Sequence, residues 1–181
     1  MGTKIVGTYQ NPRSLAEVRP DLLVEINATV KDGHSCLRGE VMGVITSSGL
    51  SRRRTRSLVK TTAFATTSPN GTVEDGTKYR VGDVLKNAAG TTVGTIQTIV
   101  GNNITLAANA AVAVAIDAAV YASDGSEKAS WIADDGSDGD GDTTVTAIVG
   151  GFLLESLIIG LDATAKTELG GISLPGGIFK Y

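Results

Sequence analysis

The stretch that decides the fold is HSCLRGEVMGVITSSG, residues 34–49. Its apolar and β-branched residues offer a buried face to a β-strand: Leu37, Val41, Val44 and Thr46. Gly39 and Gly43 interrupt this strand, and glycine inside a strand indicates a bulge or the close approach of another backbone. We therefore expect a strand here that packs tightly against a neighbouring segment.

The flanking segments continue the β pattern. Residues 21–31 alternate loosely and predict a first strand, which turns at Asp32-Gly33. Residues 51–77 are polar and rich in turn formers, including Pro69-Asn70-Gly71. We interpret this second segment as a long surface excursion with a short strand at residues 57–65.

Residues 78–125 have the pattern of a self-contained β unit. Short strand-like runs end at Gly or Asn, and Gly101-Asn102-Asn103 predicts a hairpin turn. The alanine-rich part leaves two structures open, because alanine favours a helix while the Val-Ala alternation favours a strand. A helical turn at 107–113 followed by a strand at 118–122 is one of them.

The last part of the chain combines strands with a short helix. A strand is expected around Trp131-Ile132 and another in TTVTAIVGG, residues 143–151. Residues 152–160 fit either a helix or a strand, and residues 163–169 are the best helix candidate in the chain. The apolar tail, rich in Gly and Pro, predicts an edge strand or a docking arm.

Length and composition set the fold class. The chain has 181 residues, 41% hydrophobic and only 4% aromatic, which is enough to bury a core. Small and β-branched residues dominate and favour sheets over a helical bundle. We predict a mainly β protein with short helices: a compact mixed-β body (21–77 and 126–181), an inserted small β subdomain (78–125) and an extended N-terminal arm (1–20).

Charge is distributed unevenly along the chain. Residues 1–60 carry ten Lys and Arg against five Asp and Glu, whereas residues 61–181 carry six against fourteen. Such a division can join opposite charges between subunits, or offer a basic arm to an acidic partner. The acidic majority would repel phosphate, so we expect no nucleic-acid partner.

Several function classes lack the residues that they need. One cysteine and one histidine make neither an internal disulfide nor a multi-ligand Cys/His metal site. His34 and Cys36 would share a strand face, but no third group orients them for catalysis. No phosphate-binding loop, nucleophile elbow or metalloprotease motif is present. We therefore expect no enzyme, no cofactor and no metal site.

No membrane or export signal is expected either. The longest apolar run, residues 107–122, is broken by Asn109 and Asp117 and is too short to span a bilayer. The first ten residues lack the apolar segment of a secretory signal.

The densest carboxylate cluster is DDGSDGDGD, residues 134–142. Asp138, Asp140 and Asp142 match the first ligands of an EF-hand calcium loop, but Thr143 and Val149 stand where that loop requires Gly and Glu. A solvated hairpin loop whose glycines adopt positive φ is the favoured interpretation. An adventitious weak cation site is the alternative.

The one sharp basic run comprises Arg52, Arg53, Arg54 and Arg56. It lacks the interleaved aromatic residues of a nucleic-acid patch. A solvated loop and a docking patch for carboxylates of a protein partner remain open, since guanidinium groups pair with carboxylates in a bidentate manner.

Three stretches together resemble the head decoration (cement) proteins of tailed bacteriophages, of the lambda type. They are HSCLRGEVMGVITSSG, then VGDVLKNAAGTTVGTIQTIVGNNITLAANAAV from residue 81, and ADDGSDGDGDTTVTAIVGGFLLESLIIG from residue 133. The resemblance covers about half of the chain and lies in the order of the motifs. It implies a compact β-tulip-like body that forms a homotrimer on the outer surface of the expanded capsid, made in the host bacterial cytoplasm.

The resemblance also implies partners and contact residues. In such proteins an N-terminal arm adds a strand to elements of the major capsid protein, and residues 1–20 map onto that arm. We hypothesise that the arm and the basic run contact the capsid through Lys4, Ile5, Val6, Tyr9, Arg13, Arg52, Arg53, Arg54 and Arg56. The candidates for the oligomer interface are Phe152, Leu153, Ile178, Phe179 and Tyr181.

A second hypothesis is a β-rich adhesion or tail-fibre module that binds a host-surface carbohydrate. It would need exposed aromatic platforms, and the whole chain contains 3 Phe, 4 Tyr and 1 Trp.

Overall fold

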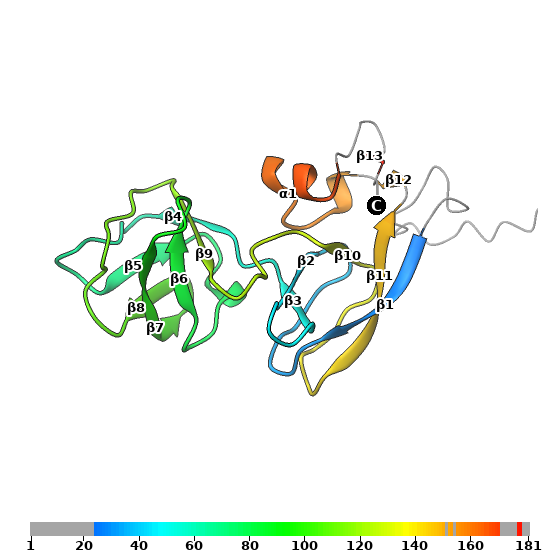
Figure 1. The fold of residues 1–181 in the computed structure, drawn as a ribbon, viewed down its shortest axis with the longest axis horizontal. Helices are drawn as coiled ribbons and strands as arrows, with labels where there is room; N and C mark the ends of the chain where they lie inside the picture. Colours follow the sequence, from blue (N-terminus) through cyan, green and yellow to red (C-terminus); the bar gives the residue numbers. More distant parts are fainter. Residues whose placement is uncertain (1–23, 151, 154, 171–176, 179–181) are drawn as a thin grey trace, which may run out of the picture.

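The computed structural model describes residues 24–150, 152–153, 155–170 and 177–178. Within them the chain forms two closed β-barrels that lie side by side (Figure 1). The first, which we call the body barrel, is built from segments on both sides of the second, the inserted barrel. The predicted mainly β class is confirmed, whereas the predicted arm at 1–20 lies outside the described residues.

The body barrel has five strands in the order β1-β11-β10-β2-β3. β1 pairs antiparallel with β11 along its whole length and meets β3 through a single parallel pair, Val30 with Ser51. The strand bounds are β1 Val24–Val30, β2 Val41–Val44, β3 Ser51–Arg53, β10 Trp131–Ala133 and β11 Thr143–Gly150.

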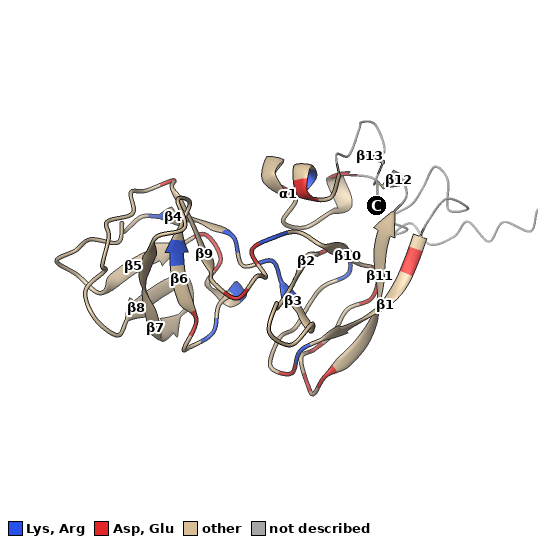
Figure 2. Ribbon diagram, viewed as in Figure 1, with Lys and Arg blue, Asp and Glu red and all other residues tan. Residues whose placement is uncertain are grey.

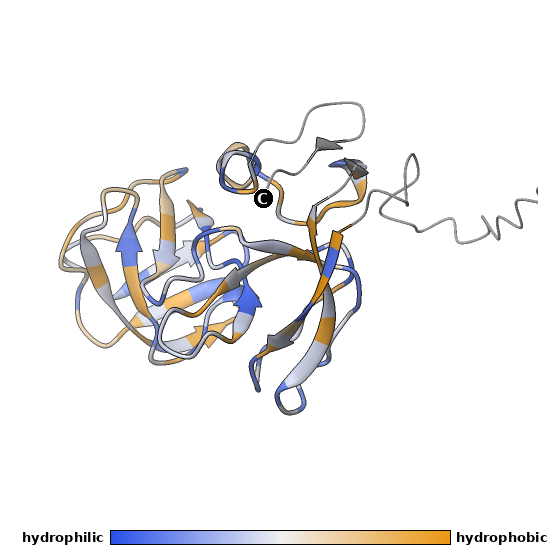
Figure 3. Cartoon of the chain, turned by 45° about the vertical axis from the view of Figure 1, so that its right-hand side comes forward, coloured by the Kyte–Doolittle hydropathy of each residue, from blue (hydrophilic) through white to orange (hydrophobic). Residues whose placement is uncertain are grey.

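The wall formed by β10 and β11 is buried on both faces. One face contributes Trp131, Ala133 and Ala147 to the barrel interior, and the other packs Ile132 and Ile148 under the C-terminal segment. This segment comprises β12 Phe152–Leu153, η3 Glu155–Leu157 and α1 Ala163–Glu168, with β13 Gly177–Ile178 paired to β12. Apolar residues of the β10–β11 wall therefore pack on one side in the barrel interior and on the other side against the C-terminal segment (Figure 3).

The short helix α1 begins where the sequence predicted it. Asp162 is its N-cap, and the Asp162 carboxylate accepts a hydrogen bond from the backbone N–H of Ala165 at 2.6 Å. Ala165 and Leu169 then cover the outer face of the β10–β11 wall. Residues 152–160 combine both of the alternatives left open above, a short strand followed by a 3-10 turn.

The inserted barrel has six strands in the order β4-β5-β8-β7-β6-β9. Its core is a single cluster of buried residues that includes Phe64, Tyr79, Leu85 and Ile96. The bounds are β4 Ser57–Lys60, β5 Asn70–Val73, η2 Gly76–Lys78, β6 Val84–Asn87, β7 Thr92–Val100, β8 Asn103–Leu106 and β9 Ala119–Ala122. The predicted hairpin turn between β7 and β8 is confirmed.

The inserted barrel begins earlier in the chain than residue 78. Residues 57–73, interpreted above as a surface excursion of the body, form β4 and β5 and contribute Val59, Phe64 and Val73 to the core. Thr and Ser between these residues make the segment appear polar overall, which conceals the alternation. The strand expected at 57–65 is present in part, as β4.

The alanine-rich segment forms a strand but no helix. Residues 107–113 are irregular, and β9 follows at Ala119–Ala122. Ala110 donates its backbone N–H to the carbonyl of Ser68, and Phe64 and Val114 form an isolated bridge. These long-range backbone bonds replace the local bonds of a helical turn and override alanine's propensity.

Candidate functional site at the joint between the barrels

Two chain crossings connect the barrels, one leaving the body at residues 54–56 and one returning at 123–126. They are bonded to each other: the Thr55 N–H donates to the Ser126 carbonyl at 3.2 Å, and the two hydroxyls lie 3.1 Å apart. A Cβ atom on Gly43 would lie 2.1 Å from the Ser126 carbonyl oxygen, so only glycine fits there. The close backbone approach predicted from Gly43 is confirmed.

Arg52 joins the body barrel to the inserted barrel. Its side chain is buried, and its guanidinium group binds the carboxylates of Asp83 at 2.6 Å and Asp124 at 3.0 Å. It also donates to the Lys78 carbonyl at 2.7 Å. One side chain of β3 thus contacts the inserted barrel twice and the returning crossing once, which fixes the two barrels relative to each other. Figure 2 shows basic and acidic segments of the ribbon gathered where the two barrels meet.

Arg53 makes a second set of contacts across the joint. Its guanidinium group pairs with the buried carboxylate of Glu40 at 2.5 Å and with Asp75 of the inserted barrel at 3.0 Å. Arg80 of the inserted barrel donates in return to the Gly33 carbonyl of the body at 2.9 Å.

Arg54 ties the outgoing crossing to the C-terminal segment. Its guanidinium group lies 2.9 Å from Asp162 and 3.1 Å from Glu168, and it donates to the Glu127 carbonyl at 2.9 Å. Asp162 therefore serves both as the cap of α1 and as the partner of a buried arginine.

The basic run is an internal joint, which corrects its interpretation as a docking patch or a solvated loop. Arg52 and Arg54 are 2% and 3% exposed, and their guanidinium groups bind carboxylates of the same chain. Most of these carboxylates belong to the acidic portion after residue 60, so the charge asymmetry of the sequence is compensated largely within one chain. Only Arg56 keeps a partly exposed guanidinium group with a single long contact, at 3.9 Å from Asp162.

The partner carboxylates were not recognised in the sequence as site residues. Asp83, Asp124 and Asp162 lie far from the arginines along the chain and belong to no motif. Burial alone would raise the pKa of Asp124, but hydrogen bonds from Ser126 and the charge of Arg52 outweigh it and lower that pKa. The one signal for these contacts in the sequence was the alternation of side chains along a strand, which sends Arg52 and Arg53 to opposite faces.

His34 lies beside the joint and makes it sensitive to pH. Burial, followed by the charges of Arg52 and Arg80, lowers the pKa of His34 to about 4 from 6.5. Between pH 6.5 and about pH 4, the His34 imidazole is therefore protonated in the unfolded chain but not in the folded chain. The free energy of unfolding falls as the pH is lowered through this range. The full loss is about 3.5 kcal/mol, at about 1.4 kcal/mol for each pKa unit, and about two thirds of it falls between pH 7 and pH 4.5.

Chemical denaturation at pH 7 and pH 4.5 measures this loss, because His34 is the single histidine of the chain. The variant His34→Asn should lose markedly less stability over the same interval. An equal loss in both proteins would show that His34 does not govern the pH dependence.

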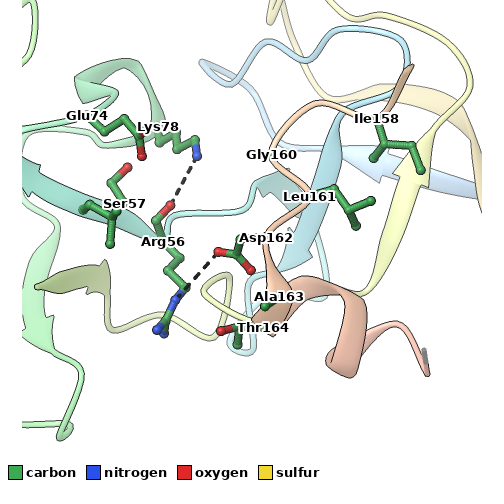
Figure 4. A pocket seen from close by; sticks show the side chains of 11 residues that line it. Arg56, Ser57, Glu74, Lys78, Ile158, Gly160, Leu161, Asp162, Ala163 and Thr164 are labelled. Carbon is green, nitrogen blue, oxygen red and sulfur yellow. Dashed lines mark hydrogen bonds and ion pairs between the residues drawn. The ribbon is translucent and has the colours of Figure 1, made fainter. Parts of the chain in front are cut away.

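An open cleft of about 540 Å³ lies beside the joint, between the inserted barrel and the segment that leads into α1. Arg56, Ser57, Glu74 and Lys78 form one wall (Figure 4). The other wall is formed by Ile158, Gly160, Leu161, Asp162, Ala163 and Thr164.

The remaining predicted contact residues have different outcomes. Leu153 is fully buried against the β10–β11 wall, so it is a core residue and not an interface residue. Phe152 pairs with Ile178 in the β12–β13 ladder. The others lie outside the described residues: Lys4, Ile5, Val6, Tyr9, Arg13, Phe179 and Tyr181.

The acidic loop packs against the turn that follows β1. Asp142 accepts a hydrogen bond from the Asp32 N–H at 2.7 Å, and Asp32 accepts one from Gly141 at 3.0 Å. Gly139 and Gly141 have positive φ, as predicted. In the described part of the chain, no three His, Cys, Asp or Glu side chains gather as a metal-binding group.

Cys36 is a buried core residue beside this loop. It is 2% exposed, and burial raises the pKa of its thiol. The thiol therefore stays protonated at neutral pH and packs as a small apolar group.

Over the described ranges, no helix has the length and apolar character to cross a bilayer.

Comparisons with protein-family models, with curated proteins and with solved structures find no match to this chain.

Proposed function

We propose that this chain is a decoration protein of a tailed-phage capsid. It binds the outer surface of the expanded shell as a homotrimer and stabilises the lattice of the major capsid protein. The proposal takes its family from the three resembling stretches and its physical support from the way the body barrel is assembled.

The observation that carries the proposal is the meeting of the first and third stretches in one barrel. The Gly39 N–H donates to the Ala133 carbonyl at 2.7 Å, and Cys36 forms a bridge with Ser137. Glu40 forms a further bridge with Ile159, at the end of the third stretch. Segments about 100 residues apart thus make one body, as expected of a decoration protein that carries an insertion between them.

The body barrel has exposed apolar side chains suited to contacts with other subunits. Leu37, expected above on the buried face of a strand, is 60% exposed, because β2 begins only at Val41. Ile159 is 42% exposed and lies on an adjoining segment, because its N–H donates to the Gly39 carbonyl at 2.8 Å. Ile26 on β1 is also exposed. Apolar groups in this arrangement favour association with protein surfaces.

Repetition makes modest contacts sufficient for a cement protein. When one trimer contacts several capsid subunits, each later contact forms within an existing complex, and avidity exceeds the affinity of a single site. The fixed joint then holds the inserted barrel at a defined position on the body. We also propose that the body has a β-tulip topology and that the inserted barrel acts on the outer side of the shell.

The alternative function, binding of a carbohydrate, would need exposed aromatic side chains, and three of the large ones are buried. Phe64, Tyr79 and Trp131 are at most 3% exposed and belong to the barrel cores. They cannot serve as stacking platforms without unfolding.

Co-sedimentation with empty tailed-phage capsids tests the proposal. The full chain should pellet with expanded, undecorated shells, saturate at a fixed ratio to the major capsid protein, and remain in the supernatant with unexpanded shells. Failure to pellet with expanded shells, or binding that never saturates, would refute the proposal.

A further inference from the structure

The cleft beside the joint contains two cationic side chains that the chain leaves largely unpaired. The Ser57 hydroxyl is sealed from the cleft, because Ser57 and Val59 face the core of the inserted barrel. The Lys78 ammonium group donates to the Arg56 carbonyl at 3.2 Å, and no described carboxylate lies within 4.0 Å of it. The Arg56 guanidinium group has only its 3.9 Å contact with Asp162.

The neighbouring arginines show that the other cations of the run are paired with carboxylates. Arg52, Arg53 and Arg54 each face two carboxylates, all at 3.1 Å or less. Lys78 is partly buried, and burial lowers its pKa although the charges of Asp75, Glu40 and Glu74 oppose that shift. An incoming carboxylate within hydrogen-bonding distance would supply the close anion that Lys78 lacks.

We propose that this cleft binds a carboxylate side chain from an acidic segment of the capsid protein. Lys78 would supply a compact positive charge and Arg56 a two-pronged donor. This inference rests on the proposed function, and it retains the carboxylate-docking interpretation for Arg56 alone among the four arginines of the run.

The other wall of the cleft fits the same occupant. Leu161 offers apolar surface for the methylene groups of a Glu or Asp side chain and its neighbours. Asp162 on the same wall is already paired with Arg54 at 2.9 Å. The volume of about 540 Å³ accommodates a few residues of a peptide rather than a whole domain. Glu74 is exposed at the edge of the cleft and repels a second carboxylate, which limits the site to one.

Titration of the full chain with an acetylated tetraglutamate peptide tests this site. Backbone resonances of Ser57 and Lys78 should shift as the peptide is added. Lys78→Met and Arg56→Gln should each weaken binding about tenfold, which is about 1.4 kcal/mol, since each removes a charge-assisted hydrogen bond. Glu74→Gln should strengthen binding several-fold, because it removes the repelling charge.

Matched controls separate this site from general attraction between charges. Lys86→Met removes a lysine from β6, outside the cleft, and should bind the peptide like the unchanged protein. Acetylated tetraglutamine should not bind. Equal affinity in Lys78→Met and in the unchanged protein, or equal binding of the two peptides, overturns the assignment.

The capsid assay distinguishes failure of this inference from failure of the proposed function. Lys78→Met should lower the affinity for expanded shells while leaving the protein folded. If shells bind both proteins equally, the cleft is not a capsid contact although the proposed function holds. If peptide binding follows the prediction but shells bind neither protein, the carboxylate site stands and its assignment to the capsid falls.

Discussion

Deleting residues 2–20 is expected to abolish binding to expanded capsids while leaving the two barrels folded. The cores of both barrels are complete within residues 24–170, so the deletion removes no described packing. An arm that adds a strand to a partner contributes a row of main-chain hydrogen bonds. Loss of the whole row should reduce affinity at least a hundredfold in co-sedimentation with expanded shells.

Single substitutions in the arm test whether main-chain bonding is the cause. Val6→Pro removes a backbone N–H and should weaken capsid binding strongly, whereas Val6→Ala keeps that group and should retain most of it. Circular dichroism and a sedimentation measurement of the trimer report folding and assembly in each variant. Undiminished capsid binding after the deletion would contradict the assignment of residues 1–20 as the arm.

Replacing Arg52 with alanine is expected to be the most destabilising change at the joint, costing about 3 to 4 kcal/mol in the free energy of unfolding. The substitution leaves the carboxylates of Asp83 and Asp124 without their shared cation and empties a buried site between the barrels. Urea denaturation at pH 7 measures the loss. Lys60→Ala is the matched control, because the exposed Lys60–Asp117 pair lies away from the joint.

A double-mutant cycle shows whether the loss comes from the ion pair itself. Asp83→Asn alone should also destabilise the protein, and Arg52→Ala combined with Asp83→Asn should cost less than the sum of the two single changes. Strict additivity, or a loss in Lys60→Ala as large as that in Arg52→Ala, would show that the joint contributes no specific stabilisation.

Local patterns in the sequence predicted the elements whose structure depends on near neighbours. The alternation in 143–150, the helix candidate at 163–169 and the turn at Gly101-Asn102-Asn103 each identify their element within a few residues. Gly43 even indicated a close backbone contact, although its partner, Ser126, was not identifiable from the sequence.

The joint could not be predicted because its contacts connect distant parts of the chain. Arg54 and Asp162 are 108 positions apart, and Arg52 and Asp124 are 72 apart. A run of arginines is typical of an exposed patch, and only the folded chain shows that three of the four form close ion pairs within the chain. The cleft was likewise invisible, since Lys78 and Ser57 belong to no motif.

Electron cryomicroscopy of expanded, undecorated capsids incubated with the protein tests the central claim most directly. The account predicts added density at the three-fold and quasi-three-fold positions of the outer surface, with each of three copies showing one barrel on the shell and a second barrel attached to it. A bare lattice in the presence of excess folded protein, or density of a different symmetry, would contradict the account.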